Sequence, residues 1–187
     1  MRDISRDIII QASKGDMNAF ERIYKSTSGF VYNVAHRIVN NRDDAEEVAQ
    51  EVFLTIYRTL KGFRFQASLR TWIYRITVNA AINYSRKRSK KDNAAAEYSE
   101  NLKRPGMDDE LEEKIDKEHR EKIVSSMLKI LNPEQRACVV LRNIECLSYQ
   151  EIAEVLDINI NTVRSRLKRA REQLMAHARY RGVKNEL

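Results

Sequence analysis

The chain has 187 residues, of which 42% are hydrophobic and 33% charged, with 5 Gly, 2 Pro and a formal net charge of +7. This length allows one domain or two small ones, and the scarcity of glycine and proline favours helices. Two cysteines, Cys138 and Cys146, are too few for a disulfide framework or a four-cysteine zinc site. No apolar run approaches the ~20 residues that span a membrane, and no signal-peptide pattern is present. These features predict a cytoplasmic protein without metal, cofactor or membrane insertion.

The charge is distributed in blocks. Residues 1–91 carry 17 basic and 9 acidic side chains, residues 92–121 carry 5 and 11, and residues 122–187 carry 12 and 7. A basic balance favours an anionic partner such as nucleic acid. Two basic blocks with an acidic block between them indicate two units joined by a connecting segment.

The first block predicts several helices. Apolar residues recur at three- and four-residue spacing through residues 8–38. Asp43 is expected to cap the next helix, with Glu46 three residues on. The apolar stripe of that helix, which includes Tyr57, is expected to face inward until Gly62 ends it. No alternating strand pattern competes, so the block is predicted to be all-α.

Residues 63–91, FRFQASLRTWIYRITVNAAINYSRKRSKK, combine aromatic side chains, amides and a basic end. Aromatic faces beside a cationic groove suit unpaired bases, because every base has a π-face and every nucleotide a phosphate. Ser68 is expected to cap a helix, on which a rotation of 100° per residue places one polar stripe, formed by Arg75, Asn79, Asn83 and Arg86. Trp72 is more typical of a core residue, and one of Phe63 and Phe65 is expected to be exposed. The basic end after Asn83 suits phosphate, or is merely a solvated helix end.

A short acidic stretch lies inside the basic first block, at residues 43–51. Carboxylates at a helix N-terminus complement the helix dipole, which is one sufficient explanation. The alternative is a docking surface for a basic protein partner, with Gln50 taking part.

Residues 89–110 are rich in Ser, Lys, Asp and Asn with little periodicity, and predict a linker. A charged helix is expected from Asp108. Asn132 with Gln135 and Ser148 with Glu151 then form the capping boxes of two further helices.

A turn at residues 157–159 and a long last helix complete a helix-turn-helix. Val163 and Leu167 are expected to face inward, so one outer face carries side chains that suit base edges and phosphates: Asn161, Arg164, Ser165, Lys168 and Arg169. The alternative is a merely solvated helix face.

These segments resemble bacterial RNA polymerase sigma factors of the extracytoplasmic-function (ECF) group, which is group 4 of the sigma-70 family. Residues 43–64, DDAEEVAQEVFLTIYRTLKGFR, are similar to the family's core-binding segment. Residues 68–88, SLRTWIYRITVNAAINYSRKR, are similar to its melting and −10 segment, and residues 131–174 to its −35 domain.

The resemblance implies an all-α chain of two small helical domains: sigma region 2 at residues 1–91, a flexible linker at 92–118, and sigma region 4 at 119–187. It implies core RNA polymerase, through the β′ clamp and the β flap, and promoter DNA as partners, together with an anti-sigma protein. It implies neither catalysis nor a small-molecule substrate.

Candidate site residues follow from the motifs and from this resemblance. For the −10 strand they are Phe63, Arg64, Phe65, Gln66, Ala67, Ser68, Arg75, Asn79, Asn83, Arg86 and Lys87. For the −35 duplex they are Asn161, Thr162, Arg164, Ser165, Lys168 and Arg169. For the polymerase they are Asp44, Glu47, Gln50 and Glu51.

Two other classes of protein remain open. The helix-turn-helix alone also suits a LuxR-type regulator of duplex operators, but such a regulator has no use for the aromatic segment. A nucleic-acid-processing enzyme lacks support, because neither a metal-ligand spacing nor a glycine-rich phosphate loop is present. The chain departs from the family at Asp157, where a turn glycine is usual, and at residues 159–161, which replace a Pro-x-Gly pattern. These departures affect the expected −35 preference.

Overall fold

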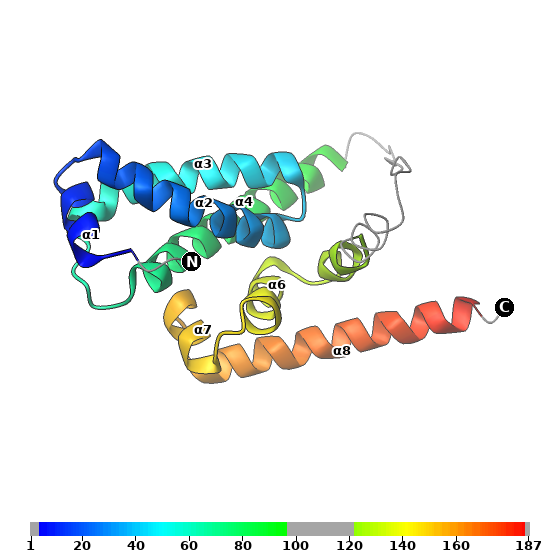
Figure 1. Cartoon of the computed structure of the whole chain (residues 1–187). Helices are drawn as coiled ribbons and strands as arrows, with labels where there is room; N and C mark the ends of the chain where they lie inside the picture. Colours follow the sequence, from blue (N-terminus) through cyan, green and yellow to red (C-terminus); the bar gives the residue numbers. More distant parts are fainter. Residues whose placement is uncertain (1–3, 97–121, 186–187) are drawn as a thin grey trace, which may run out of the picture.

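The computed structural model describes residues 4–96 and 122–185, and these residues form helices with no strand among them (Figure 1). The predicted all-α fold of two helical domains is confirmed. The N-terminal domain contains α1 (Arg6–Ser13), α2 (Met17–Val39), α3 (Arg42–Thr59), the 3-10 turn η1 (Leu60–Gly62) and α4 (Leu69–Ala96). The C-terminal domain contains a helix at 122–129, α6 (Pro133–Val139), the π-helical turn η2 (Val140–Ile144), α7 (Tyr149–Leu156) and α8 (Ile160–Asn185).

The N-terminal domain is a bundle of α2, α3 and α4, with the short α1 packed against α2 at one end. Its centre is aliphatic, and Ile23, Val34, Val48, Ile56 and Ile73 are completely buried. Each such side chain stabilises the fold by about 1.5–3 kcal/mol through removal of apolar surface from water. The core holds α4 firmly against α2 and α3, so the exposed face of α4 is a rigid support.

Two expectations for α3 were wrong. Its N-cap is Asn41, whose side chain accepts a hydrogen bond from the amide of Asp44 at 3.0 Å, so Asp43 does not cap it. Asn41 has extended backbone dihedrals, and it lies where Asn40 has ended α2 in a left-handed conformation (φ 59°). Tyr57, expected to face inward, is 49% exposed and packs edge-on against Phe20.

The caps predicted for the C-terminal domain are confirmed. Asn132 with Gln135, and Ser148 with Glu151, form complete capping boxes at the starts of α6 and α7. Asp157 ends α7 in a left-handed conformation, and α8 begins at Ile160. Val163 and Ala170 anchor α8 to the domain core. The predicted helix-turn-helix is therefore present at residues 149–185.

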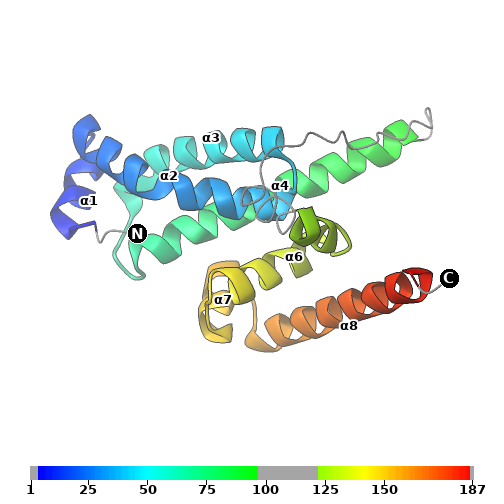
Figure 2. The ribbon, with the colours of Figure 1, turned by 45° about the vertical axis from the view of Figure 1, so that its right-hand side comes forward.

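The two domains pack against each other. Figures 1 and 2 both show α6 and α7 lying between the N-terminal bundle and α8. Arg136 on α6 donates to the carbonyl oxygen of Ile38 at 2.6 Å, near the end of α2, where carbonyl groups lack helical partners. Asn40 and Ser125 exchange two hydrogen bonds, of 2.6 Å and 3.1 Å. No motif or spacing in the sequence indicated this packing.

α4 continues past residue 91 to Ala96, so its last turn lies within the range predicted as linker. The charged helix expected from Asp108 begins outside the described residues. In the parts of the chain that the structure describes, no helix is both long and apolar enough to cross a membrane.

Candidate nucleic-acid interface

An aromatic cluster lies where the loop at residues 63–68 meets α4. The Phe63 ring packs between the rings of Phe65, at 4.9 Å between centroids, and Trp72, at 5.2 Å. The guanidinium of Arg6 lies over the Phe65 ring, 4.5 Å from its centroid. Phe63, Phe65 and Trp72 are all partly buried, so the expectation that one of the two phenylalanines is exposed was wrong.

The loop backbone has an unusual conformation at Phe65. Its φ is +56°, a left-handed value that is unfavourable for a bulky residue and that often marks functional loops. Ser68 caps α4 as predicted, because its hydroxyl accepts from the Thr71 amide at 3.0 Å. The adjacent Gln66 and Ala67 are exposed. The loop is thus fixed at both ends and presents polar and small groups between them.

A pocket of about 630 Å³ opens beside this loop. The N-terminal domain contributes Phe63, Arg64, Gln66, Ala67, Trp72 and Arg75 to its wall. Glu154 and Asp157 of α7 complete the wall from the C-terminal domain. A nucleobase fits such a volume, but the two carboxylates would repel its phosphate.

The predicted polar stripe of α4 is exposed at all four positions, Arg75, Asn79, Asn83 and Arg86, and the neighbouring Lys87 is exposed as well. Asn83, Arg86 and Lys87 line a further hollow of about 250 Å³ with Glu51 of α3. Two arginines of the stripe have acidic partners in the C-terminal domain. Arg75 pairs with Asp157 at 2.6 Å, and Arg86 donates through Nε to Glu134 at 2.6 Å.

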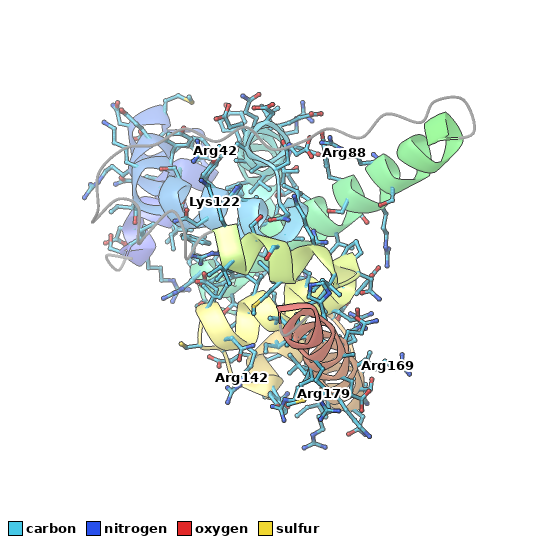
Figure 3. All side chains as sticks on the ribbon, turned by 90° about the vertical axis from the view of Figure 1, so that its right-hand side faces the viewer. Arg42, Arg88, Lys122, Arg142, Arg169 and Arg179 are labelled. Atoms are coloured by element: carbon cyan, nitrogen blue, oxygen red, sulfur yellow. The ribbon has the colours of Figure 1, made fainter. Side chains whose placement is uncertain are left out.

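The outer face of α8 has the polar groups predicted for duplex recognition. Asn161, Arg164, Lys168 and Arg169 are exposed, while Thr162 and Ser165 are partly buried. Arg164 donates to Asn161 Oδ1 at 2.9 Å, which orients both side chains at the start of the helix. In Figure 3 the labelled Arg169 and Arg179 lie at the end of the molecule away from the N-terminal helices. This face is open to a duplex.

The predicted polymerase contacts on α3 fall into two kinds. Asp44 is only 7% exposed: it pairs with Arg88 and accepts a hydrogen bond from the Tyr84 hydroxyl at 3.0 Å. The same Tyr84 proton is shared with Glu47 Oε2, which lies 2.9 Å from the hydroxyl oxygen. Burial of the phenol, followed by these hydrogen bonds to Glu47 and Asp44, raises the pKa of Tyr84 to about 12. Asp44 therefore joins α3 to α4, whereas Gln50 and Glu51 are exposed.

An apolar groove beside Gln50 was missed by the sequence analysis. It measures about 770 Å³, lies between α2 and α3, and is lined chiefly by side chains of those helices: Met17, Phe20, Tyr24, Phe53, Leu54 and Tyr57. Leu54 is 55% exposed and Met17 is 61% exposed, which is unusual for large apolar side chains grouped together. The sequence contains one indication of this groove: the apolar stripe on α3 is too wide for a single buried face. Four of its residues cannot all face inward: Phe53, Leu54, Ile56 and Tyr57.

Tyr74, which is 2% exposed, forms a polar contact between the domains. Its hydroxyl donates to Glu145 Oε2 at 2.6 Å and accepts from Arg70 at 3.0 Å. Burial and the Glu145 hydrogen bond raise the pKa of Tyr74 to about 12. Among residues 4–96 and 122–185, no group of three or more His, Cys, Asp or Glu is placed to hold a metal ion.

Family models match both domains. The model described as Sigma-70 region 2 matches residues 23–91, and that described as Sigma-70, region 4 matches residues 121–174. These ranges contain the aromatic loop, the stripe of α4 and the outer face of α8.

Curated relatives and solved structures agree with these matches. The chain is 33% identical over 174 residues to the ECF RNA polymerase sigma-E factor of Haemophilus influenzae, covering 89% of this chain and 91% of the relative. It is 34% identical over 173 residues to that of Escherichia coli K12, covering 89% and 90%.

Two solved complexes share the fold. The structure of CnrH with the cytosolic domain of CnrY has a TM-score of 0.66 at 24% identity, covering 95% of this chain and 99% of that chain. The structure of RpoE with the anti-sigma factor NepR from Bartonella quintana has a TM-score of 0.61 at 20% identity, covering 84% and 94%. With relatives above 30% identity over almost their whole length, the chain belongs to the ECF group of RNA polymerase sigma factors.

Proposed function

We propose that this protein binds core RNA polymerase and directs it to promoters by contacting the −35 duplex with α8 and the −10 non-template strand with the loop at 63–68 and α4. The observation that carries the proposal is the presence of two different nucleic-acid surfaces in one chain. An open helix face suits a duplex groove, while an aromatic pocket beside arginines and amides suits an unpaired base. A regulator that binds only duplex operators needs the first surface alone.

The division of roles follows the predicted domain limits, with region 2 at residues 1–91 and region 4 at residues 119–187. In the −10 set, the loop residues hold the extruded base and the α4 residues contact the strand beside it. In the −35 set, Asn161, Arg164 and Lys168 are exposed on the first turns of α8 and reach base edges or phosphates. Catalysis of RNA synthesis belongs to the polymerase, so this chain needs no catalytic residue of its own.

The polymerase contact is assigned to α3. Gln50 and Glu51 are exposed there, and the apolar groove adjoins Gln50. A partner surface that is both basic and apolar, such as the β′ clamp, would pair with the carboxylate and pack on the groove. Glu47 contributes to the polymerase contact while it is hydrogen-bonded to Tyr84. Asp44 stabilises the contact indirectly, because it holds α3 against α4 through Tyr84. A second polymerase contact is assigned to the C-terminal domain at the β flap.

An anti-sigma protein is the proposed negative regulator. Two solved structures that share the fold are complexes, one with the cytosolic domain of CnrY and one with the anti-sigma factor NepR. The exposed groove between α2 and α3 offers a surface that such a protein could cover in competition with polymerase. The proposed location is the cytoplasm, where promoter DNA and polymerase are found.

Run-off transcription with purified core polymerase on genomic fragments tests the proposal. The expected result is initiation at a small set of start sites that core polymerase alone does not use. Transcripts that are identical with and without this protein would refute it. The double variant Arg164→Ala/Lys168→Ala is the matched control, because it should lose selectivity for these sites while still binding core polymerase.

A further inference from the structure

The N-terminal helix α1 lies beside the loop at residues 63–68, although it precedes residues 23–91, which match the region 2 model. Ile9 and Ala12 are the buried residues of α1, and the helix packs against α2 and η1. Figure 1 shows α1 at the end of the bundle where α3 leads into this loop. The start of α1 is therefore next to the segment proposed to hold the extruded base.

Arg6, the first residue of α1, stacks on the aromatic loop. Its guanidinium carbon Cζ lies 4.5 Å from the centroid of the Phe65 ring. A cation over the face of a ring is attracted by the π electrons. Phe65 has a left-handed φ of +56°, which is unfavourable for a bulky residue, so a contact that holds its ring also stabilises this loop conformation. Arg6 is therefore placed to position the loop.

The stacked geometry leaves the hydrogen-bonding edge of Arg6 unused. A guanidinium is planar, so it can lie face-on to a ring while its five N–H donors point outward in its own plane. The Arg6 side chain is exposed. Within residues 4–96 and 122–185, no carboxylate pairs with Arg6, whereas Arg75 of α4 pairs with Asp157 at 2.6 Å. The free edge of a guanidinium is suited to bidentate binding of phosphate.

The position of Arg6 fits the phosphate of a nucleotide bound at the loop. Phe63, Arg64 and Gln66 line the pocket of about 630 Å³, and Phe65, which Arg6 contacts, lies among them in the chain. A base in this pocket leaves its phosphate at the rim, because a charged group is costly to remove from water. Arg64 is exposed as well. The loop side of the rim therefore carries two cations.

We infer that Arg6 is a further strand-binding residue, which positions Phe65 through its stacked guanidinium and pairs with the phosphate of the nucleotide beside the loop. The inference rests on the proposed function in taking this loop as the site of the extruded base. It adds α1 to the surface that contacts the −10 strand, so the strand is held by three elements of one domain: α1, the loop and α4.

The two roles of Arg6 predict two separate effects on binding. Loss of an exposed cation–π contact alone weakens binding about two- to fivefold. Loss of one phosphate contact on a single strand reduces the slope of log affinity against log salt concentration by about 0.7. Arg6→Ala should show both effects. Arg6→Lys keeps the charge and should keep the slope, but it should bind more weakly because an ammonium group has no planar face to stack.

The test uses holoenzyme reconstituted with each variant and a labelled single-stranded oligonucleotide, which carries the −10 non-template sequence of a start site mapped by run-off transcription. Fluorescence anisotropy gives the affinity across a series of salt concentrations. The matched control is Lys14→Ala, which removes the same charge from an exposed position at the other end of α1. Thermal unfolding of the free chains checks that the variants keep the Tm of the wild type.

The expected result is weaker binding and a smaller salt slope for Arg6→Ala, a wild-type slope for Arg6→Lys, and wild-type behaviour for Lys14→Ala. A wild-type slope in Arg6→Ala, or an equal decrease in Lys14→Ala, would overturn the phosphate contact. If wild-type holoenzyme does not prefer this oligonucleotide to one of scrambled sequence, the proposed function itself fails, so the two failures are distinguishable.

Discussion

Replacing Phe65 with alanine is expected to impair promoter opening. Stacking on an aromatic ring returns about 1–3 kcal/mol per base, so its loss should slow or weaken opening by about 5- to 150-fold. The loss of folding stability should be smaller than for a core residue. Phe65 is partly buried and contacts Phe63 and Arg6. Replacing a fully buried phenylalanine with alanine lowers the free energy of unfolding by about 3–5 kcal/mol, so a loss of about 2 kcal/mol is expected for Phe65→Ala. The left-handed backbone is equally strained with alanine, so it adds no difference.

The assay follows opening by the permanganate reactivity of unpaired thymines on a duplex promoter and on a template mismatched across the −10 region. Extrusion of a base costs a few kcal/mol, and the mismatched template removes that cost, so it should restore most of the lost activity. Asn79→Ala, at an exposed position, should show the same pattern with no loss of stability. Tyr149→Ala is the control, because Tyr149 also lies beneath an arginine, Arg142, at 5.2 Å, but does not line the pocket beside the loop. A defect of equal size on both templates would refute the base-holding role.

Four other outcomes are expected. Arg164→Ala or Lys168→Ala should each weaken binding of the −35 duplex by the holoenzyme by about 1–3 kcal/mol in competition assays. Initiation on a mismatched template should be nearly unchanged. If both variants keep the −35 selectivity of the wild type, the assignment of α8 is refuted. The free chain should bind promoter duplex weakly, because polymerase must fix the separation of two small domains; nanomolar sequence-specific binding at physiological salt would instead favour a stand-alone regulator. Leu54→Glu should weaken core-polymerase binding in a pull-down without lowering Tm, since Leu54 is 55% exposed; undiminished capture would remove the groove from the interface. At pH 8 a thiol reagent should modify exposed Cys146 once per native chain, because burial raises the pKa of the Cys138 thiol to about 11; two modifications in the native state would contradict that burial.

Local structure was largely predictable, because helix caps depend on neighbouring residues. The boxes at Asn132 and Ser148 formed as their sequences indicate. The cap of α3 was assigned to Asp43 rather than Asn41, because several candidate cap residues follow one another there. Asn41 becomes the cap because Asn40 ends α2 in a left-handed conformation directly before it. That conformation cannot be predicted from the sequence.

Contacts between distant residues were not predictable. Tyr74 and Glu145 are 71 residues apart, and nothing near either residue indicates the other. Asp44 was expected to face a partner protein, but Tyr84 and Arg88 enclose it, because α3 crosses α4 at that point. The aromatic loop was found from composition alone, whereas the apolar groove needed the fold, since Tyr24 and Leu54 become neighbours only when α2 packs on α3.

Under the proposed function, the buried Asp44 also sets how far apart two contacts of the chain lie. By binding Tyr84 and Arg88 it locks the start of α3 to the far part of α4, so the proposed polymerase contact and the proposed strand contact belong to one rigid piece. The separation between the polymerase active centre and the extruded base then has a fixed value. The C-terminal domain, which carries α8, contacts this piece through exposed ion pairs such as Arg75–Asp157, and such pairs are weak. Start sites should therefore keep a constant distance from the −10 element, while the spacing to the −35 element varies.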